Sequence, residues 1–369
     1  MAHRTTGIIF LFAIFFFGPS AFGALDTADI DKVIKKEVLE QQDLATIDNF
    51  VAAGVQELLN TKDFSAVGNL RTEIVARAHS SQTSADIQYN PEFIAAAAKN
   101  LEKAFADAKK ISDADQRAKV TLNLMILLDN LNNPQLADLA LKMVDSEDTA
   151  VRYWAVHAVT NPYIVVQFNT DKAPAATART IIEQLARRTD VETSPYILTQ
   201  IAQFGATLNM PQAQELLMKV ADARLKKYQT WKVDYVLLDE TVLKLLADRM
   251  SGPDKAAAAW RFGQLYAYAI ELYIKGKGTL DAAQRDQLAG VLVQTERNAL
   301  TKLQIPQSGI RNAIEKKDDQ ALLTEYKNLF GEGEVAGKFT TTFNVTYPSP
   351  DGTKRTTPLP LPEPPKAAK

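Results

Sequence analysis

Apolar residues recur at helical spacing in one segment after another between residues 29 and 330, and this pattern limits what the chain can fold into. Leu124, Leu128 and Leu131, for example, fall on one face of a helix. No segment between residues 24 and 337 alternates apolar and polar residues with the β-branched enrichment typical of a strand. The pattern therefore predicts an all-α body whose helices each bury one face.

Prolines mark where many of these helices begin. In Asn133-Pro134 and Ser194-Pro195 the proline suits the first helical position, and the polar residue before it can cap the helix. Asn90-Pro91 is interpreted in the same way. Together these marks predict helices near 91–111, 113–131, 134–144, 148–160, 174–188, 195–208, 211–228, 234–250, 253–275, 281–304, 306–317 and 318–330.

The stretch from Asp145 to Pro162 shows how two such helices fit together. Val151, Ala155 and Ala158 fall on one face, acidic residues precede the helix, and the proline ends it. A partner helix, Pro134 to Val144, lies just upstream, and only a short acidic turn separates the two. We therefore expect the two helices to pack antiparallel.

The order of Asp145, then Val151-Arg152, then Ala155 and Ala158 resembles the HEAT repeat, an armadillo-type helical repeat. In that family the arginine reaches the aspartate of a nearby inter-helix turn, so the resemblance implies contact between Arg152 and Asp145. The alternative is an ordinary amphipathic helical hairpin. One repeat cannot bury its apolar face alone, and helix pairs recur every ~35–45 residues along this chain. We therefore expect an α-solenoid of antiparallel helix pairs.

The first residues, Met1 to Gly23, predict a secretory signal. Arg4 precedes an apolar run, Ile8 to Phe17, and Ala21-Phe22-Gly23 supplies small residues for cleavage before Ala24. An uncleaved anchor is the alternative, but the run is shorter than the ~20 residues that a spanning helix needs. We expect export to the periplasm or outside the cell, without a transmembrane anchor after cleavage.

Composition narrows the possible stabilising and binding chemistry. Cysteine is absent, so an exported chain of this kind depends on packing rather than on disulfides and has no thiolate chemistry. Removing the signal leaves about 41 basic residues against 44 acidic ones, a net charge of about −3. Proteins that bind nucleic acid carry a clear basic excess, so nucleic acid is not an expected partner.

The C-terminal segment differs from the body. Lys338 to Tyr347 alternates with period two and predicts a strand, which turns at Pro350-Asp-Gly352 and returns over Lys354 to Thr357. The hairpin must dock on the helices or on a partner, because two strands alone are marginal. The expected organisation is a signal (1–23), N-terminal helices (24–84), a HEAT-like body (85–335), a β-hairpin (336–357) and a proline-rich tail, disordered or extended (358–369).

Residues typical of catalysis are sparse. His79 and His157 are isolated, and structural or surface roles are expected for both. The carboxylate pairs Asp113/Asp115 and Glu147/Asp148 stand at helix starts, where capping accounts for them. Asp239 and Glu240 fall in an early helical turn. The sequence contains no Gly-x-Ser-x-Gly, phosphate-loop, dinucleotide or calcium-loop motif. We therefore expect no catalytic residues, no cofactor and no metal ligands.

Two clusters suggest binding. Trp260, Tyr266 and Tyr273 lie in one aromatic-rich helix and are candidates for a ligand surface, although such rings also fill wide cores. A basic cluster follows the chain from residue 219 to 232; it forms either a solvated face or a site for an anionic ligand. Its members are Lys219, Arg224, Lys226, Lys227 and Lys232.

These observations predict an exported scaffold or binding module for a protein partner or an extended ligand, and not an enzyme. The alternative is a polysaccharide-active helical enzyme that uses acidic and aromatic residues of a groove.

Overall fold

The computed structural model of the chain describes residues 25–79, 83–252 and 254–365. The predicted signal, Met1 to Gly23, lies outside the described residues. The chain divides into two compact units, residues 1–100 and 101–369, which are described separately below. Among the described residues, no helix combines the length and apolarity needed to cross a membrane.

The first unit contains α1 (Ile30–Val33), α2 (Gln41–Asn60), α3 (Val67–Ala76) and most of α4 (Thr83–Ala108). α2 packs against both α1 and α3. Pro91 was predicted to start a helix, and this prediction is wrong because Pro91 lies inside α4. The predicted boundary at residue 84 and the division after Asn100 both fall on this long helix.

The second unit is a run of helices joined by short connections. In chain order they are α5 (Ala114–Asn130), η1 (Pro134–Leu136), α6 (Ala137–Leu141), α7 (Thr149–Thr160), α8 (Pro162–Asn169), α9 (Ala175–Thr189), α10 (Pro195–Thr207), α11 (Pro211–Gln229), α12 (Leu237–Arg249), α13 (Lys255–Lys275), η2 (Gly276–Gly278), α14 (Ala282–Gln294), the π-helical η3 (Thr295–Leu300), α15 (Gly309–Glu315) and α16 (Asp319–Phe330).

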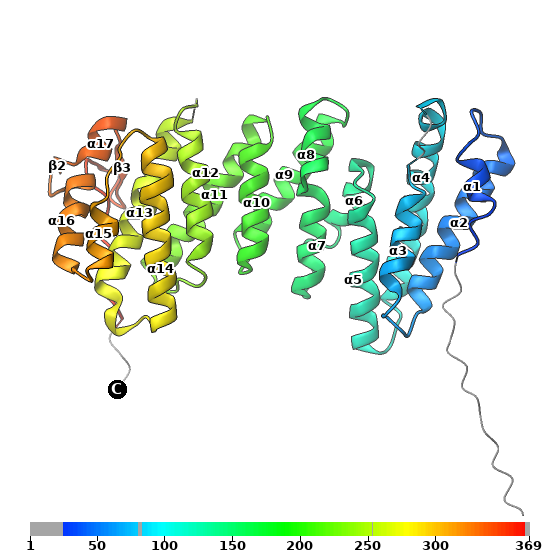
Figure 1. Ribbon diagram of the computed structural model, residues 1–369, viewed down its shortest axis with the longest axis horizontal. Helices are drawn as coiled ribbons and strands as arrows, with labels where there is room; N and C mark the ends of the chain where they lie inside the picture. Colours follow the sequence, from blue (N-terminus) through cyan, green and yellow to red (C-terminus); the bar gives the residue numbers. More distant parts are fainter. Residues whose placement is uncertain (1–24, 80–82, 253, 366–369) are drawn as a thin grey trace, which may run out of the picture. The chain divides into compact units, whose positions relative to one another are not determined.

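These helices form two rows. In one row α5, α7, α10, α12 and α14 contact one another in that order, and in the other α6, α9, α11, α13 and α16 do the same. Helices of opposite rows also pack together, as α6 does on α7 and α10 on α11. Figure 1 shows the helices of residues 101–369 following one another in chain order. The expected all-α fold of paired helices is confirmed.

Polar caps start the helices much as the sequence predicts. Asp113 accepts a hydrogen bond from the N–H of Gln116, and Asp148 accepts one from that of Ala150. The sequence missed α8, because Asn161-Pro162 was interpreted only as the end of α7. The side chain of Asn161 also accepts from the N–H of Ile164, so the same residue pair ends one helix and starts the next.

The predicted strand from Lys338 is wrong in part. Its first residues form α17 (Lys338–Phe343), where the Phe339 ring stacks on Phe262 of α13 at 5.3 Å. A helical turn places Phe339 and Phe343 together, with ring centroids 5.1 Å apart, so packing overrides strand propensity. A short C-terminal hairpin is present: β3 (Tyr347–Pro348) pairs antiparallel with β4 (Lys354–Arg355). A second, unpredicted hairpin joins β1 (Gly331–Glu332) to β2 (Val335–Ala336).

The proline-rich segment after β4 is extended and packs on its own chain. We call residues 358–362 the strap. Gln264 of α13 donates to the carbonyl of Leu359 at 2.9 Å and accepts from its N–H at 2.8 Å. Trp231, in the loop between α11 and α12, donates to the carbonyl of Pro362 at 3.0 Å. The tail was expected to be disordered or extended, and the strap is extended because side chains of the body bind its backbone groups.

Candidate functional site

The residues of the predicted repeat motif form part of the helix packing. Val151, Ala155 and Ala158 are buried on α7, which packs between α5 and α10 of its row. The small side chains of Ala155 and Ala158 allow the close contacts of α7 with its neighbouring helices. Their role in the structure is packing.

The HEAT resemblance had implied that Arg152 contacts Asp145. In the structure Arg152 does not pair with Asp145. Its guanidinium donates to Glu192, in the connection from α9 to α10, and to the carbonyls of Ser146 and Glu147 in the turn before α7. The Asp145 carboxylate is exposed and instead lies 3.5 Å from Arg188. Arg152 therefore forms its ion pair with the buried Glu192 carboxylate. It fixes the turn before α7 by donating to the backbone oxygens of that turn.

Glu192 is charged inside this cluster. Burial acts to raise the pKa of its carboxyl, but hydrogen bonds from Arg152, from the N–H of Ser194 and from Arg188 outweigh that effect and lower the pKa. The carboxylate also accepts from the N–H of Thr193. It thereby fixes the connection between α9 and α10.

A second buried ion pair joins α11 to α12. Arg224 donates to both oxygens of Asp239, at 2.6 Å and 3.0 Å, and the hydroxyl of Tyr228 donates to Asp239 at 2.8 Å. Burial acts to lower the pKa of Arg224, but the charge of Asp239 outweighs it and raises that pKa. Burial raises the pKa of Tyr228. Arg224 therefore turns inward and does not belong to the exposed part of the basic cluster.

The aromatic helix α13 does not offer the expected ligand surface. Tyr266 and Tyr273 are buried, and the Tyr266 hydroxyl donates to the carbonyl of Leu292 at 2.8 Å. Trp260 is half-buried, with the guanidinium of Arg261 4.3 Å from its ring centroid. Its surroundings include one carboxylate, Asp222, which is paired with Arg261. The prediction is therefore wrong for both tyrosines, whose rings fill the core.

The histidines remain apart in the structure. His79 is exposed, and the Nδ1 atom of His157 lies 2.6 Å from the buried carboxylate of Asp129, joining α7 to α5. The rings of Tyr153 and Trp154 pack beside His157. Within the described ranges, His, Asp and Glu side chains do not gather into a group that could hold a metal ion.

The strongest candidate site is an open groove of about 710 Å³, which we call the basic groove. One wall is the connection between α9 and α10, residues 189–193, and the other is the end of α11 with the loop that follows it. Four lysines line the groove: Lys219, Lys226, Lys227 and Lys232.

The charges of the basic groove do not balance. Its three carboxylates are already paired: Asp190 with Lys219, Asp222 with Arg261, and Glu192 with two arginines. In the described part of the chain, Lys226, Lys227 and Lys232 have no carboxylate at ion-pair distance. Four lysines therefore face three carboxylates in the lining, and three of these lysines remain without an acidic partner among the described residues.

Apolar side chains stand exposed close to the basic groove. Val191, in the wall between α9 and α10, is 64% exposed, and Tyr235, in the loop after α11, is 60% exposed. Lys227 lines both the basic groove and a smaller pocket of about 70 Å³ that Tyr235 also lines. The sequence marked the lysines as a cluster but not these apolar residues, because only the fold brings the two connections together.

Comparison with protein-family models gives no match, and comparison with curated proteins gives none either. The function is therefore inferred from the residues and charges of the basic groove.

Proposed function

We propose that this chain is an exported helical-repeat binding module whose basic groove holds an acidic, extended segment of a protein partner. The observation that carries the proposal is the set of Lys226, Lys227 and Lys232, which line one groove while its carboxylates are engaged elsewhere. Complementary charge steers a partner to such a surface and fixes its register.

The shape of the site favours a polypeptide segment over a small anion. The groove is open and long enough to include two inter-helix connections, and exposed apolar side chains stand next to its lysines. Tyr235 and Val191 offer exposed apolar surface to a partner. Tyrosine is common among residues that dominate binding energy, so Tyr235 is the expected main contact. Stacked helix pairs commonly offer extended surfaces of this kind.

Export and repeat type belong to the same proposal. The apolar run and cleavage signal of residues 1–23 support export, and the order of Val151-Arg152 with Ala155 and Ala158 supports a HEAT-like repeat. The two-row packing of α5 to α16 is compatible with that repeat class.

The test is a titration of the purified chain with a fluorescein-labelled, Glu-rich peptide that contains one tyrosine, followed by fluorescence anisotropy. We expect saturable binding that weakens as salt rises from 50 to 500 mM, because salt screens exposed charges. A Lys-rich peptide of the same length is the control. Equal binding of the two peptides, or no saturable binding of the Glu-rich one, contradicts the proposal.

A further inference from the structure

A second cavity, of about 300 Å³, lies beneath the strap and is separate from the basic groove. We call it the strap cavity. Its walls come from α13, α16, the β1–β2 hairpin, β4 and the strap itself. One side of the cavity is therefore formed by the proline-rich segment, which the sequence predicted as a disordered or extended tail.

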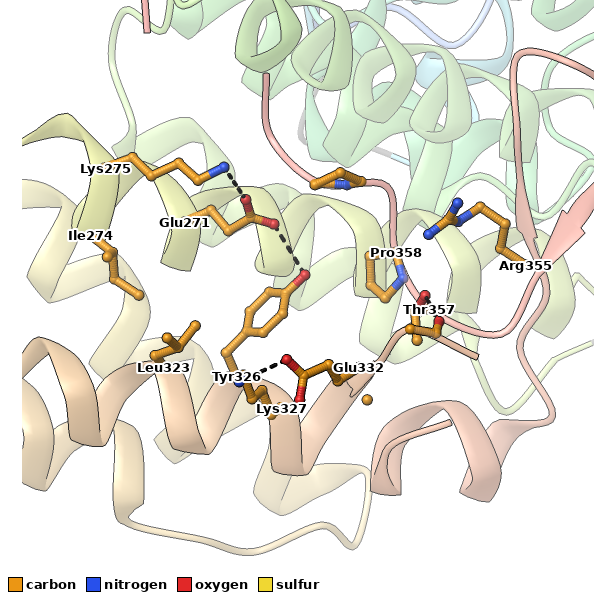
Figure 2. A pocket seen from close by; sticks show the side chains of 13 residues that line it. Glu271, Ile274, Lys275, Leu323, Tyr326, Lys327, Glu332, Arg355, Thr357 and Pro358 are labelled. Atoms are coloured by element: carbon orange, nitrogen blue, oxygen red, sulfur yellow. Dashed lines mark hydrogen bonds and ion pairs between the residues drawn. The ribbon is translucent and has the colours of Figure 1, made fainter. Parts of the chain in front are cut away.

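Most polar groups around the strap cavity already have partners. The carboxylate of Glu271 accepts from the Tyr326 hydroxyl at 3.0 Å and lies 3.0 Å from the Nζ atom of Lys275. Lys327 pairs with Glu332 at 2.8 Å. Figure 2 shows these three contacts as dashed lines along one side of the cavity.

Arg355 is the exception. Its Nε atom is buried and has no hydrogen-bond partner among the described residues, and no carboxylate of that part of the chain pairs with its guanidinium. A buried N–H without a partner is unfavourable, so a group that accepts from it would be bound favourably. In Figure 2 the guanidinium of Arg355 points toward the strap.

The opposite end of the strap cavity is apolar. Figure 2 shows Ile274 and Leu323 on the far side of Tyr326 from Arg355. The rings of Pro358 and Pro360 add further apolar surface from the strap. A ligand that fits both ends has an anionic head and an apolar body.

We propose that the strap cavity binds a small organic monocarboxylate with an aliphatic chain, its carboxylate on Arg355 and its chain toward Ile274 and Leu323. A carboxylate suits the planar fork of a guanidinium, which donates two parallel hydrogen bonds to it. The chain displaces water from apolar walls, which favours binding roughly in proportion to the area covered.

The experiment measures binding of octanoate, below the concentration at which it forms micelles, to the full chain by isothermal titration calorimetry. Octanol supplies the chain without the charge, and acetate and inorganic phosphate supply charge without the chain. We expect octanoate to bind at least about tenfold more tightly than any of the three. Absence of octanoate binding, or equal binding of acetate or phosphate, overturns the proposal.

Variants then locate the site. Arg355→Met should weaken octanoate binding at least about tenfold, and Leu323→Trp, which fills the apolar end, should abolish it. Arg297→Met is the matched control, because Arg297 is exposed and does not line the strap cavity. Circular dichroism confirms that each variant folds, and Arg355→Gln, which also removes the charge, replaces Arg355→Met if the latter does not. Unchanged octanoate affinity in folded variants at both positions contradicts the assignment.

Discussion

The N–H of Leu361 donates a hydrogen bond to Oε2 of Glu271 across 2.9 Å, although 90 residues separate them in the sequence. The carbonyl of Leu361 accepts from Lys275 at 2.8 Å, and the Leu361 side chain is 1% exposed. One residue of the strap is thus fixed through its N–H, its carbonyl and its side chain. The strap is therefore part of the folded unit formed by residues 101–369.

Replacing Leu361 by alanine should lower the free energy of unfolding by about 2–5 kcal/mol, because it removes a buried aliphatic side chain and leaves a cavity. Urea denaturation followed by circular dichroism measures the change. Glu363→Ala is the control from the same segment: Glu363 is exposed, and losing its surface ion pair with Lys275 should change stability by about 0.5 kcal/mol or less. If Leu361→Ala also costs less than that, the strap does not contribute to the fold.

Glu192→Gln should destabilise the chain by about 3 kcal/mol at pH 7, because Arg152 and Arg188 lose the carboxylate they share. The pKa of Glu192 is lowered from an ordinary value of 4.5, so its contribution to stability is fully present above pH 4.5. That contribution is lost as the pH falls through the lowered pKa. Urea titrations from pH 7 to pH 3 should show the gap between native and variant closing below pH 4.5. A gap that stays constant with pH would exclude this ion pair as the cause.

The Arg224–Asp239 pair should behave as a unit. Arg224→Met alone leaves a buried carboxylate without its cation and should cost about 3–5 kcal/mol, and Asp239→Leu alone should cost a similar amount. The double variant should cost less than the sum of the two, since neither charge is then left unpaired. Chemical denaturation of all four proteins measures the coupling, and strict additivity would contradict it.

Two glycines in helices should respond oppositely to alanine. A Cβ atom at Gly205 of α10 would lie 2.7 Å from the carbonyl oxygen of Ala213 and 2.9 Å from the backbone nitrogen of Leu217, so Gly205→Ala should destabilise the close packing of α10 on α11. A Cβ atom at Gly290 of α14 would meet no described atom within 4 Å other than those of its chain neighbours and its own helix backbone, and alanine should stabilise the helix by about 0.5–1 kcal/mol. Thermal unfolding of the two variants checks both signs. A stabilised Gly205→Ala would show that the two helices are not in close contact.

Most helices of the body were predictable because they carry a local signal at their first residues. Asp113 and Asp148 cap where the sequence places a helix start, and Pro134 and Pro195 occupy first positions. The C-terminal segment was not predictable in the same way. Phe339 takes a helical turn because α13 supplies Phe262 as a partner, and that contact depends on the fold.

The basic groove and the strap cavity were likewise predictable only in part, because each combines residues that are far apart in the sequence. The sequence marks Lys226, Lys227 and Lys232 as a cluster because they are close along the chain. It does not show that Arg224 turns inward to Asp239, or that Val191 lies in the opposite wall of the groove. The strap cavity was missed altogether, because Arg355, Leu323 and the strap come to line one cavity only through the fold.

The most direct test of the proposed function reverses the charge of the basic groove and measures the dissociation constant of the labelled Glu-rich peptide. The variant Lys226→Glu/Lys227→Glu/Lys232→Glu is compared with Lys103→Glu/Lys244→Glu/Lys338→Glu, which has the same net charge but alters exposed lysines elsewhere. If the lysines of the basic groove bind the peptide, the groove variant should bind it at least about tenfold more weakly than the control variant does. Equal dissociation constants for the two variants would contradict the proposed function.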